Sequence, residues 1–415
     1  MTAMTDATAS TPLPFARPSI DTAEEEAVLR VLRSGWITTG KEALAFETEF
    51  ADFLAPSGTD PVYCLSTSSA TAGLHLAMEA LGVNENSLVF VPTLTFTATA
   101  ETARYLGAEL VFVDSMGNSP LMDLDDLTKK IRAVRDGKDP YNPALPLQAP
   151  LAGKKPALIA AVHYGGLPCD MVALRNLADR ENLALIEDAA HSFPSWVEGQ
   201  GYAGTLSDVG VFSFYATKTM TCAEGGMIAT RNREARDRMT TMRLHGIDRP
   251  VWARYTDARA SWDYDVVAPG YKYNLNDILA AMGRVQLAKA PGFLAERRAI
   301  AARYDEAFSR IPGIEIPPSA PSDARHLYPV RIGVGKDRDA FAKALQERGI
   351  GVSVHFRPLH CMSYWQGRYA LTDASLPHAR DWHKHSLSLP IWQGMSSSDV
   401  ERVIRAVHEA SGSPA

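Results

Sequence analysis

The strongest constraint on the fold is the alternation of short apolar runs with amphipathic segments along the first part of the chain. The segments between the runs show helical periodicity, for example at 70–81, 99–106 and 171–180. Buried strands of a parallel sheet are apolar on both faces, whereas half-exposed strands alternate apolar and polar residues. The pattern therefore predicts an α/β fold with a mainly parallel sheet between helices. The apolar runs lie at residues 62–66, 87–91, 109–114, 157–162, 184–187, 209–214 and 227–230.

The pattern changes after about residue 255. We expect a smaller C-terminal α/β domain over residues 256–415, following a large domain over residues 13–255. The expected elements of the smaller domain are helices at 276–289, 296–311, 338–348 and 399–410 and strands at 327–332 and 351–356.

Two segments stand apart from this organisation. Residues 1–12 are mostly small and polar, so we expect a disordered tail. Residues 137–155 contain four prolines and little periodicity, which predicts a Pro-rich surface excursion from the large domain.

Composition and charge favour a cytoplasmic protein that acts on small molecules. The net charge of −6 gives no electrostatic attraction to nucleic acid. The four cysteines are widely spaced and form no CxxC pair, which argues against a disulfide framework or a metal site. The N-terminus lacks the features of a signal peptide, and no apolar run approaches the ~20 residues that span a membrane. We therefore expect no nucleic acid, membrane or metal partner.

Polar residues follow several of the predicted strands. Asp188 and Lys218 each come soon after an apolar run, and one is a carboxylate while the other is an amine. Because ligands of parallel sheets bind at the carboxyl ends of the strands, these two groups are expected to share one cleft. The same edge of the sheet is expected to hold residues 66–71, residues 92–96 and His163.

Asp188 and Lys218 together have the chemistry that pyridoxal 5'-phosphate (PLP) requires. A lysine holds the aldehyde of PLP as a Schiff base, and an aspartate keeps the pyridine nitrogen protonated, so that the ring accepts electrons. Burial beside an apolar strand would also lower the pKa of Lys218, as this chemistry needs. Taken singly, Asp188 is equally well explained as a helix cap or a solvated carboxylate. A surface lysine is the alternative for Lys218, although its position just after an apolar strand favours the buried, functional interpretation.

Two further features are compatible with a bound cofactor. Residues 66–73 join a strand to a helix with small and hydroxyl side chains, where free N–H groups and the helix dipole favour a phosphate. By itself, this segment is better explained as an ordinary serine-rich helix cap. Phe96 is either a core residue or, if it lies in the cleft, a ring that stacks on a flat cofactor.

In these residues the chain resembles the DegT-type sugar aminotransferases, which are PLP enzymes of fold type I, the aspartate-aminotransferase fold. The matching motifs follow the order of the family over about residues 14–408, and in detail they look most like the branch that makes UDP-4-amino-4-deoxy-L-arabinose. The resemblance implies a large PLP-binding domain and a smaller C-terminal α/β domain. The motifs lie at residues 34–40, 69–75, 162–166, 187–191, 212–218, 222–226, 270–275 and 348–356.

The resemblance implies a role for each matching residue. Lys218 would bind PLP and move a proton between substrate and cofactor, and Asp188 would pair with the pyridine nitrogen. Phe96 would pack against the ring, with His191 beside it. Phosphate contacts are implied for Ala70, Thr71 and Ser213, and for Asn274 of a second subunit. The active site would therefore need a homodimer. Substrate contacts are implied for Thr39, His163, Lys272 and His355.

The implied reaction is a ping-pong amino transfer. L-glutamate would convert PLP to its pyridoxamine form, which would aminate a keto group at C4 or C3 of a nucleotide-linked sugar. Dehydratase relatives carry histidine at the position of Lys218, so the lysine favours amino transfer over deoxygenation. Two alternatives stay open: a PLP enzyme of the same fold acting on a non-sugar ketone such as a cyclitol, and a non-catalytic regulatory relative. The second would be expected to lack Lys218 or Asp188.

Overall fold

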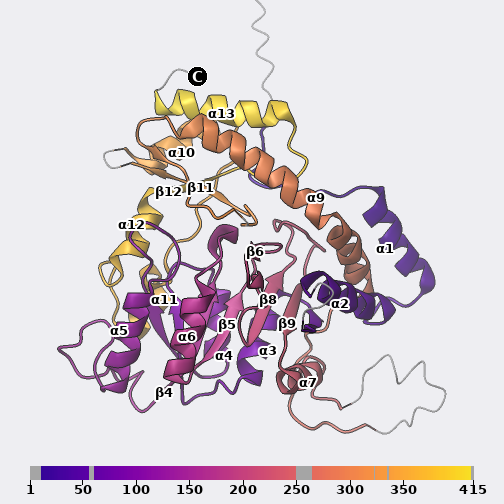
Figure 1. The fold of residues 1–415 in the computed structure, drawn as a ribbon, viewed down its shortest axis with the longest axis vertical. Coiled ribbons are helices and arrows are strands. Elements are labelled where there is room, and N and C mark those ends of the chain that lie inside the picture. Colours follow the sequence, from indigo (N-terminus) through magenta and orange to yellow (C-terminus); the bar gives the residue numbers. More distant parts are fainter. Residues whose placement is uncertain (1–10, 56–59, 249–263, 322, 334–335, 413–415) are drawn as a thin grey trace, which may run out of the picture.

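The computed structural model describes residues 11–55, 60–248, 264–321, 323–333 and 336–412. Of the predicted N-terminal tail, residues 1–10 lie outside this part of the chain. Figure 1 shows a central sheet between helices and a smaller sheet beyond one of its ends, with the long helix α9 (Asp277–Phe308) running from one to the other.

The central sheet has seven strands within the described residues. β8, β5, β4, β2 and β3 run parallel, whereas β9 runs antiparallel to both of its neighbours, β8 and β1. The prediction of a mainly parallel sheet is thus confirmed. β2, β3 and β9 are buried along their whole length, as continuous apolar runs require. In spatial order the strands are β1 (Tyr63–Thr67), β9 (Gly226–Thr230), β8 (Val209–Ser213), β5 (Ala184–Asp188), β4 (Lys155–Val162), β2 (Ser87–Pro92) and β3 (Glu109–Val113).

Helices connect the strands and cover the sheet. Three of them lie where the periodicity predicts helices, and their ends differ from the prediction by one residue. Two more, α5 and α7, lie in segments whose short amphipathic pattern gave no prediction. α5 starts at Asp123, whose carboxylate accepts the N–H groups of Asp125 and Asp126. The helices are α3 (Ala70–Ala80), α4 (Ala98–Tyr105), α5 (Leu124–Arg135), α6 (Met171–Glu181) and α7 (Arg233–Met242).

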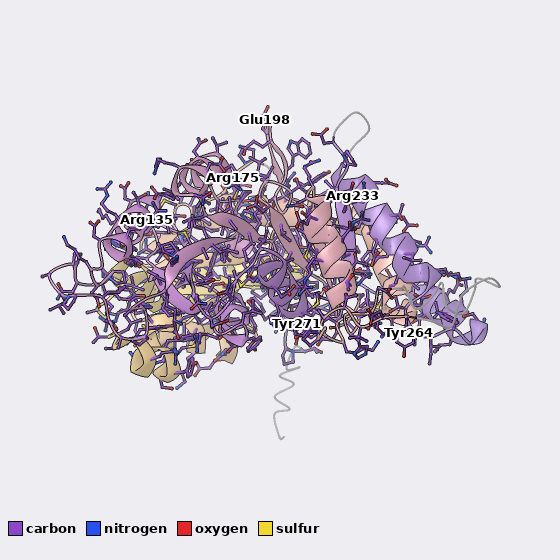
Figure 2. The ribbon with its side chains drawn as sticks, turned by 90° about the horizontal axis from the view of Figure 1, so that it is seen from below. Arg135, Arg175, Glu198, Arg233, Tyr264 and Tyr271 are labelled. Carbon is purple, nitrogen blue, oxygen red and sulfur yellow. The ribbon has the colours of Figure 1, made fainter. Side chains whose placement is uncertain are left out.

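α5, α6 and α7 carry charged side chains at the surface. Figure 2 shows Arg135, Arg175 and Arg233 at the surface, on α5, α6 and α7. Arg135 forms an ion pair of 2.9 Å with Glu181, which links the ends of α5 and α6. Glu198 projects from the turn of the small hairpin formed by β6 (Trp196–Val197) and β7 (Gly201–Tyr202).

Two N-terminal helices, α1 (Thr22–Ser34) and α2 (Lys41–Leu54), pack against the start of α9. α1 begins with a capping box. The Asp21 carboxylate accepts the backbone N–H of Glu24, and the Glu24 carboxylate accepts the backbone N–H of Asp21. It ends at Gly35, which has a φ of 74° and so takes the left-handed conformation that suits glycine. Both helix ends are therefore set by local sequence.

α9 corrects the prediction of two separate helices at 276–289 and 296–311. It is continuous over 32 residues, with Pro291 inside. The proline lacks an N–H and removes one helical hydrogen bond. Ala290 and Phe293 beside it are buried, so packing on both sides of the proline holds the helix together. None of the helices in the described ranges has the length and apolar character needed to cross a membrane.

The smaller sheet is antiparallel and consists of β10 (Ile314–Glu315), β11 (Tyr328–Ile332) and β12 (Ser386–Leu389). It packs with α10 (Arg338–Glu347) and α13 (Ser397–Ser411). The strand predicted at 351–356 is wrong, because only Ser353 pairs with the sheet, through Ser388. Beyond Ser353 the chain leaves the sheet and runs toward the central one.

Two helices that the sequence did not predict join the core of the central sheet: α11 (Ser363–Tyr369) and α12 (Pro377–His385). Trp365, Tyr369 and Trp382 from these helices belong to the same buried cluster as β2 and β3. The division of the chain into two domains near residue 255 stays a prediction. Because these three side chains pack into the core of the central sheet, apolar contacts cross the predicted boundary.

At the β3 edge of the central sheet, two tyrosine hydroxyls accept hydrogen bonds from the strand. β3 lies at the edge, where its outward N–H groups have no neighbouring strand. The N–H of Leu110 donates to the Tyr369 hydroxyl at 3.0 Å, and that of Phe112 donates to the Tyr141 hydroxyl at 2.8 Å. Tyr141 belongs to the Pro-rich segment at 137–155, so this segment covers the edge of the sheet.

Tyr141→Phe removes the acceptor of the Phe112 N–H while keeping the ring. The buried N–H is then unsatisfied, and we expect the free energy of unfolding to fall by about 1–3 kcal/mol. Urea denaturation measures this loss. Tyr105→Phe is the control, because the Tyr105 side chain is 58% exposed and should change stability by less than about 0.5 kcal/mol. Equal stability of the two variants would show that the edge contact contributes nothing.

Candidate active site

A cavity of about 370 Å³ lies at the carboxyl ends of the central strands and is closed on one side by the smaller sheet. The loops after β2, β5 and β8, the start of α3, and the segments before β11 and after Ser353 all contribute side chains. The lining residues that carry polar or aromatic groups are Phe15, Ser69, Thr71, Thr95, Phe96, Asp188, His191, Ser213, Tyr215, Thr217, Lys218, Glu224, His326, His355 and Phe356.

Lys218 lies in the loop that follows β8, and its side chain is half-buried at the cavity wall. Its main-chain N–H donates to the Tyr215 carbonyl at 2.9 Å, which shapes the loop. Burial lowers the pKa of the Lys218 amine to about 8, although the charge of Asp188 acts in the opposite direction. No hydrogen bond or ion pair in the described part of the chain occupies this amine. At pH 7 about a tenth of this amine is then an uncharged nucleophile, far more than for an exposed lysine.

Asp188 is the last residue of β5, and it is 7% exposed. Its Oδ2 accepts the Thr99 hydroxyl at 2.6 Å, and its Oδ1 accepts the Ala190 N–H at 3.2 Å. Burial raises the pKa of the Asp188 carboxyl, whereas these two donors and the charge of Lys218 lower it. The structure thus brings the two residues singled out from the sequence into one cavity.

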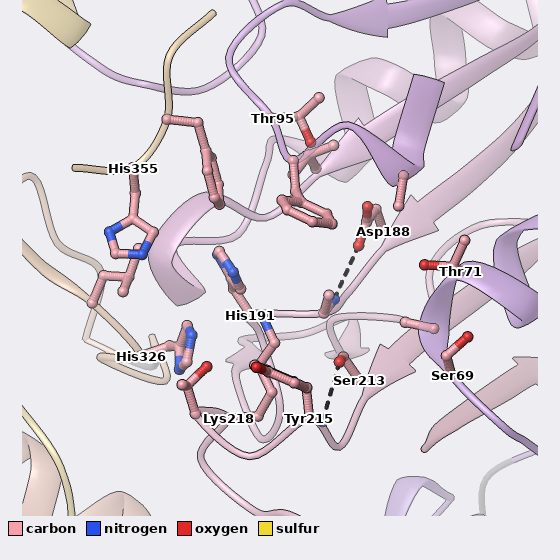
Figure 3. Close-up of a pocket in the computed structure, with 18 of the residues that line it drawn as sticks. Ser69, Thr71, Thr95, Asp188, His191, Ser213, Tyr215, Lys218, His326 and His355 are labelled. Carbon is pink, nitrogen blue, oxygen red and sulfur yellow. Dashed lines mark hydrogen bonds between the residues drawn. The ribbon is translucent and has the colours of Figure 1, made fainter. Parts of the chain in front are cut away.

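The start of α3 forms one end of the cavity. Ser69 caps this helix by accepting the Ala72 N–H at 3.1 Å, and Ala70 and Thr71 line the cavity beside it. The first N–H groups of a helix have no partner within the helix and attract an anion. β9 packs so closely here that a Cβ on Gly226 would lie 2.7 Å from the Ala70 nitrogen. Figure 3 shows Ser69 and Thr71 on the side opposite His326 and His355, with Ser213 between them.

Three histidines line the other end of the cavity, near Lys218 (Figure 3). His191 accepts the Gly165 N–H at Nδ1, at 3.2 Å, so its proton is on Nε2. His326 packs on His191 with ring centroids 4.5 Å apart, and its Nδ1 is buried without a partner among the described residues. Burial lowers the pKa of all three, that of His355 to about 4, so they are neutral at pH 7.

Phe96 also lines the cavity and is 60% exposed. It is therefore not the core residue that one sequence-based interpretation allowed. Its nearest aromatic partner is Phe356, with ring centroids 6.1 Å apart. One face of the Phe96 ring is thus open to a flat ligand.

These groups fit PLP. The cavity offers an amine for its aldehyde, a buried carboxylate for its pyridine nitrogen, a helix start for its phosphate and an open aromatic face for its ring.

Four residues predicted from the resemblance lie outside this cavity. Lys272 donates to Asn274 Oδ1 at 2.6 Å, and Asn274 donates to the Thr39 hydroxyl, so these three form a separate cluster. His163 is fully buried behind the cavity wall. It pairs through Nε2 with Glu187 at 2.8 Å and accepts the Cys169 N–H at Nδ1. Both of its ring nitrogens are used within the protein.

Sequence reasoning missed several residues of the cavity. Thr95 lies within the range 92–96 that was expected at this edge, whereas Thr99, which donates to Asp188, was not identified from the sequence. His326 and Phe356 come from the C-terminal part of the chain, and no local pattern connects them with Lys218. The residues that the sequence identified and the cavity contains are Ala70, Thr71, Phe96, Asp188, His191, Ser213, Lys218 and His355.

Comparisons with known proteins agree over nearly the whole chain. The profile of the DegT/DnrJ/EryC1/StrS aminotransferase family matches residues 18–408. Spore coat polysaccharide biosynthesis protein SpsC of Bacillus subtilis (strain 168) is 36% identical over 404 residues, with 96% of each chain covered.

Solved structures give the same result. The aminotransferase TlmJ from Streptoalloteichus hindustanus superposes with a TM-score of 0.82 at 32% identity, covering 97% of this chain and 99% of its own. The putative sugar aminotransferase Spr1654 from Streptococcus pneumoniae, in its PLP form, has a TM-score of 0.81 at 27% identity, with 97% and 99% covered. These similarities include both sheets.

The lowered pKa of Lys218 has a measurable consequence. The rate at which PLP added to cofactor-free protein produces its visible absorption band should rise with pH with a midpoint at about 8, because the neutral amine reacts. An exposed lysine would instead give a midpoint near ~10.4. Stopped-flow absorbance between pH 6.5 and 10 measures this midpoint, and Lys218→Ala should give no band. A midpoint at the value of an exposed lysine would contradict the environment described for Lys218.

Proposed function

The chain belongs to the DegT/DnrJ/EryC1/StrS aminotransferase family, and we propose that it moves an amino group from L-glutamate to a keto group, at C4 or C3, of a nucleotide-linked sugar. It is a PLP-dependent aminotransferase of fold type I. The observation that carries the proposal is the meeting of Lys218 and Asp188 in one cavity, beside the start of α3.

When bound, PLP supplies an electron sink for the reacting carbon. Lys218 holds the aldehyde and then moves a proton, since its amine has a lowered pKa and no competing partner in the described residues. Asp188 places a negative charge beside the pyridine nitrogen. Phe96 would pack on the ring, with the Nε2–H of His191 available as a donor beside it. Ala70, Thr71 and Ser213 would hold the phosphate.

The sugar acceptor is supported by the relatives and by the shape of the cavity mouth. SpsC is named for spore coat polysaccharide biosynthesis, and Spr1654 for sugar aminotransfer. Tyr215 lines the cavity and is 48% exposed, so its ring is open to a sugar ring or a base. Because the motifs resemble the branch that makes UDP-4-amino-4-deoxy-L-arabinose, we propose a nucleotide-linked keto sugar of that kind as the acceptor.

A homodimer would complete this site. Thr39, Lys272 and Asn274 are hydrogen-bonded together but line no part of the cavity of their own chain. In an isologous dimer they reach the cavity of the partner, where Asn274 meets the phosphate and the exposed Lys272 amine attracts the diphosphate of the nucleotide. His355 contacts the substrate from the same chain. A cytoplasmic location and a small domain beginning near residue 256 are parts of the same proposal.

The acceptor is tested with enzyme converted to its pyridoxamine form by L-glutamate. A 4-keto or 3-keto nucleotide sugar should restore the visible band and yield an amino sugar. Lys218→Ala should slow this reaction by more than about a thousandfold, because the proton-transferring amine is gone. Lys129→Ala is the control, since Lys129 is exposed on α5. Faster reaction of a cyclitol ketone than of every nucleotide sugar would overturn the proposed acceptor.

The shared site predicts that two inactive variants restore activity when mixed. A mixed dimer of Lys218→Ala and Asn274→Ala has one cavity with both native residues and one with neither. After unfolding and refolding together, about a quarter of the wild-type activity should return, since about half of the dimers are mixed. Each variant refolded alone is the control. No recovery would show that Asn274 acts in its own chain or not at all.

A further inference from the structure

Two buried threonine hydroxyls form a chain that ends on Asp188. Thr99, on α4, is fully buried, and its Oγ1 lies 2.6 Å from Asp188 Oδ2. The Thr95 hydroxyl lies 2.9 Å from that of Thr99 and is 1% exposed. Thr95 is also part of the cavity wall, as Figure 3 shows. The chain of hydroxyls therefore leads from the wall to the carboxylate.

The direction of these hydrogen bonds follows from the number of protons. An ionised carboxylate only accepts, so the single hydroxyl proton of Thr99 points to Asp188. The Thr99 oxygen can then only accept from Thr95, whose proton must point to Thr99. When Asp188 is ionised, both hydroxyl protons therefore point toward the carboxylate.

We propose that Thr99 is a positioning residue for the amino transfer, which fixes the orientation of the Asp188 carboxylate and stabilises its negative charge, and that Thr95 orients the Thr99 hydroxyl. This inference rests on the proposed pairing of Asp188 with the pyridine nitrogen. The two donors to Asp188, Thr99 and Ala190, bond to one carboxylate oxygen each and leave a further lone pair on each oxygen.

The surroundings of Asp188 show why the hydroxyl is needed. Burial raises the pKa of this carboxyl, and Thr99 has the largest effect in the opposite direction, ahead of Ala190, Lys218 and His163. Once Lys218 is bound to the cofactor, its charge no longer acts as a free ammonium. Without Thr99, a proton shared between the ring nitrogen and Asp188 would shift to Asp188, because a buried neutral pair is then favoured over a charged one.

Thr99→Val tests this directly, because it replaces the hydroxyl by a methyl group of similar size. The protein is loaded with PLP labelled with ¹⁵N at the ring nitrogen, and its NMR chemical shift reports whether that nitrogen carries a proton. We expect the shift of Thr99→Val to move toward that of an unprotonated pyridine, in the direction of Asp188→Asn. The half-reaction with L-glutamate should slow by about ten- to a hundredfold, as expected for a lost hydrogen bond to a charged group.

Thr102→Val is the matched control. Thr102 is fully buried on the same helix, but its hydroxyl donates to the Ala98 carbonyl at 2.9 Å and not to Asp188. Its variant should keep the wild-type chemical shift. Thr99→Ser keeps the hydroxyl and should behave as wild type, and Thr95→Val should move the signal in the same direction as Thr99→Val, but less. If Thr99→Val does not fold, the chemical shift of Thr95→Val tests the proposal in its place.

Each outcome decides the question. An unchanged chemical shift in Thr99→Val, or an equal change in Thr102→Val, would overturn the positioning role, because the contact would then be structural only. If Asp188→Asn itself leaves the nitrogen protonated as in wild type, the proposed pairing of Asp188 with the cofactor is wrong, and the inference about Thr99 fails with it. If the chemical shift changes in Asp188→Asn but not in Thr99→Val, the proposed function stands and only the role of Thr99 is wrong.

Discussion

The register of three parallel strands determines the position of every reactive group in this protein. Val162 on β4 lies opposite Asp188 on β5, which in turn lies opposite Val211 on β8. This pairing sets the Asp188 carboxylate at the same edge as the loop that carries Lys218. A shift of one residue in β5 would turn Asp188 to the other face of the sheet and separate the two groups. Catalysis by this chain therefore depends on backbone hydrogen bonds in a fully buried part of the sheet.

The electrostatics of the cavity follow from the same burial. Desolvation moves the pKa of Lys218 down and that of Asp188 up, so both groups lie closer to their neutral forms than in water. For Lys218 this produces a nucleophile, and for Asp188 it must be opposed by hydrogen-bond donors. The neutral histidines nearby add no competing charge. Within one cavity, burial makes the Lys218 amine a better nucleophile, while hydrogen-bond donors offset the effect of burial on the Asp188 carboxylate.

The sequence predicts those features of the fold and site that depend on local patterns. Strand ends identified Asp188, Lys218 and Phe96, because ligands gather where parallel strands stop. Non-local features were not predicted. Two helices were expected at 276–289 and 296–311, but buried residues on both sides of Pro291 hold one continuous helix. A strand was expected at 351–356, but only Ser353 pairs with the sheet, and Phe356 lines the cavity.

The same limit applies to residues that meet only in the folded chain. His326 lies more than a hundred residues beyond Lys218 in the sequence, and nothing near it suggests a cavity. Tyr141 covers the sheet edge from a segment whose prolines indicated only an irregular excursion. Thr99 could be recognised only when its distance to Asp188 was known. Long-range packing, rather than local propensity, decides such contacts.

The visible absorption spectrum of PLP-loaded protein, before and after L-glutamate alone, tests the central claim most directly. The account predicts a yellow band that collapses to the pyridoxamine spectrum, with one cofactor converted per chain, and that returns on addition of 2-oxoglutarate. A band that saturating glutamate leaves unchanged would contradict the proposed first half of the reaction. No band at all would contradict the assignment of Lys218 as the residue that holds the cofactor.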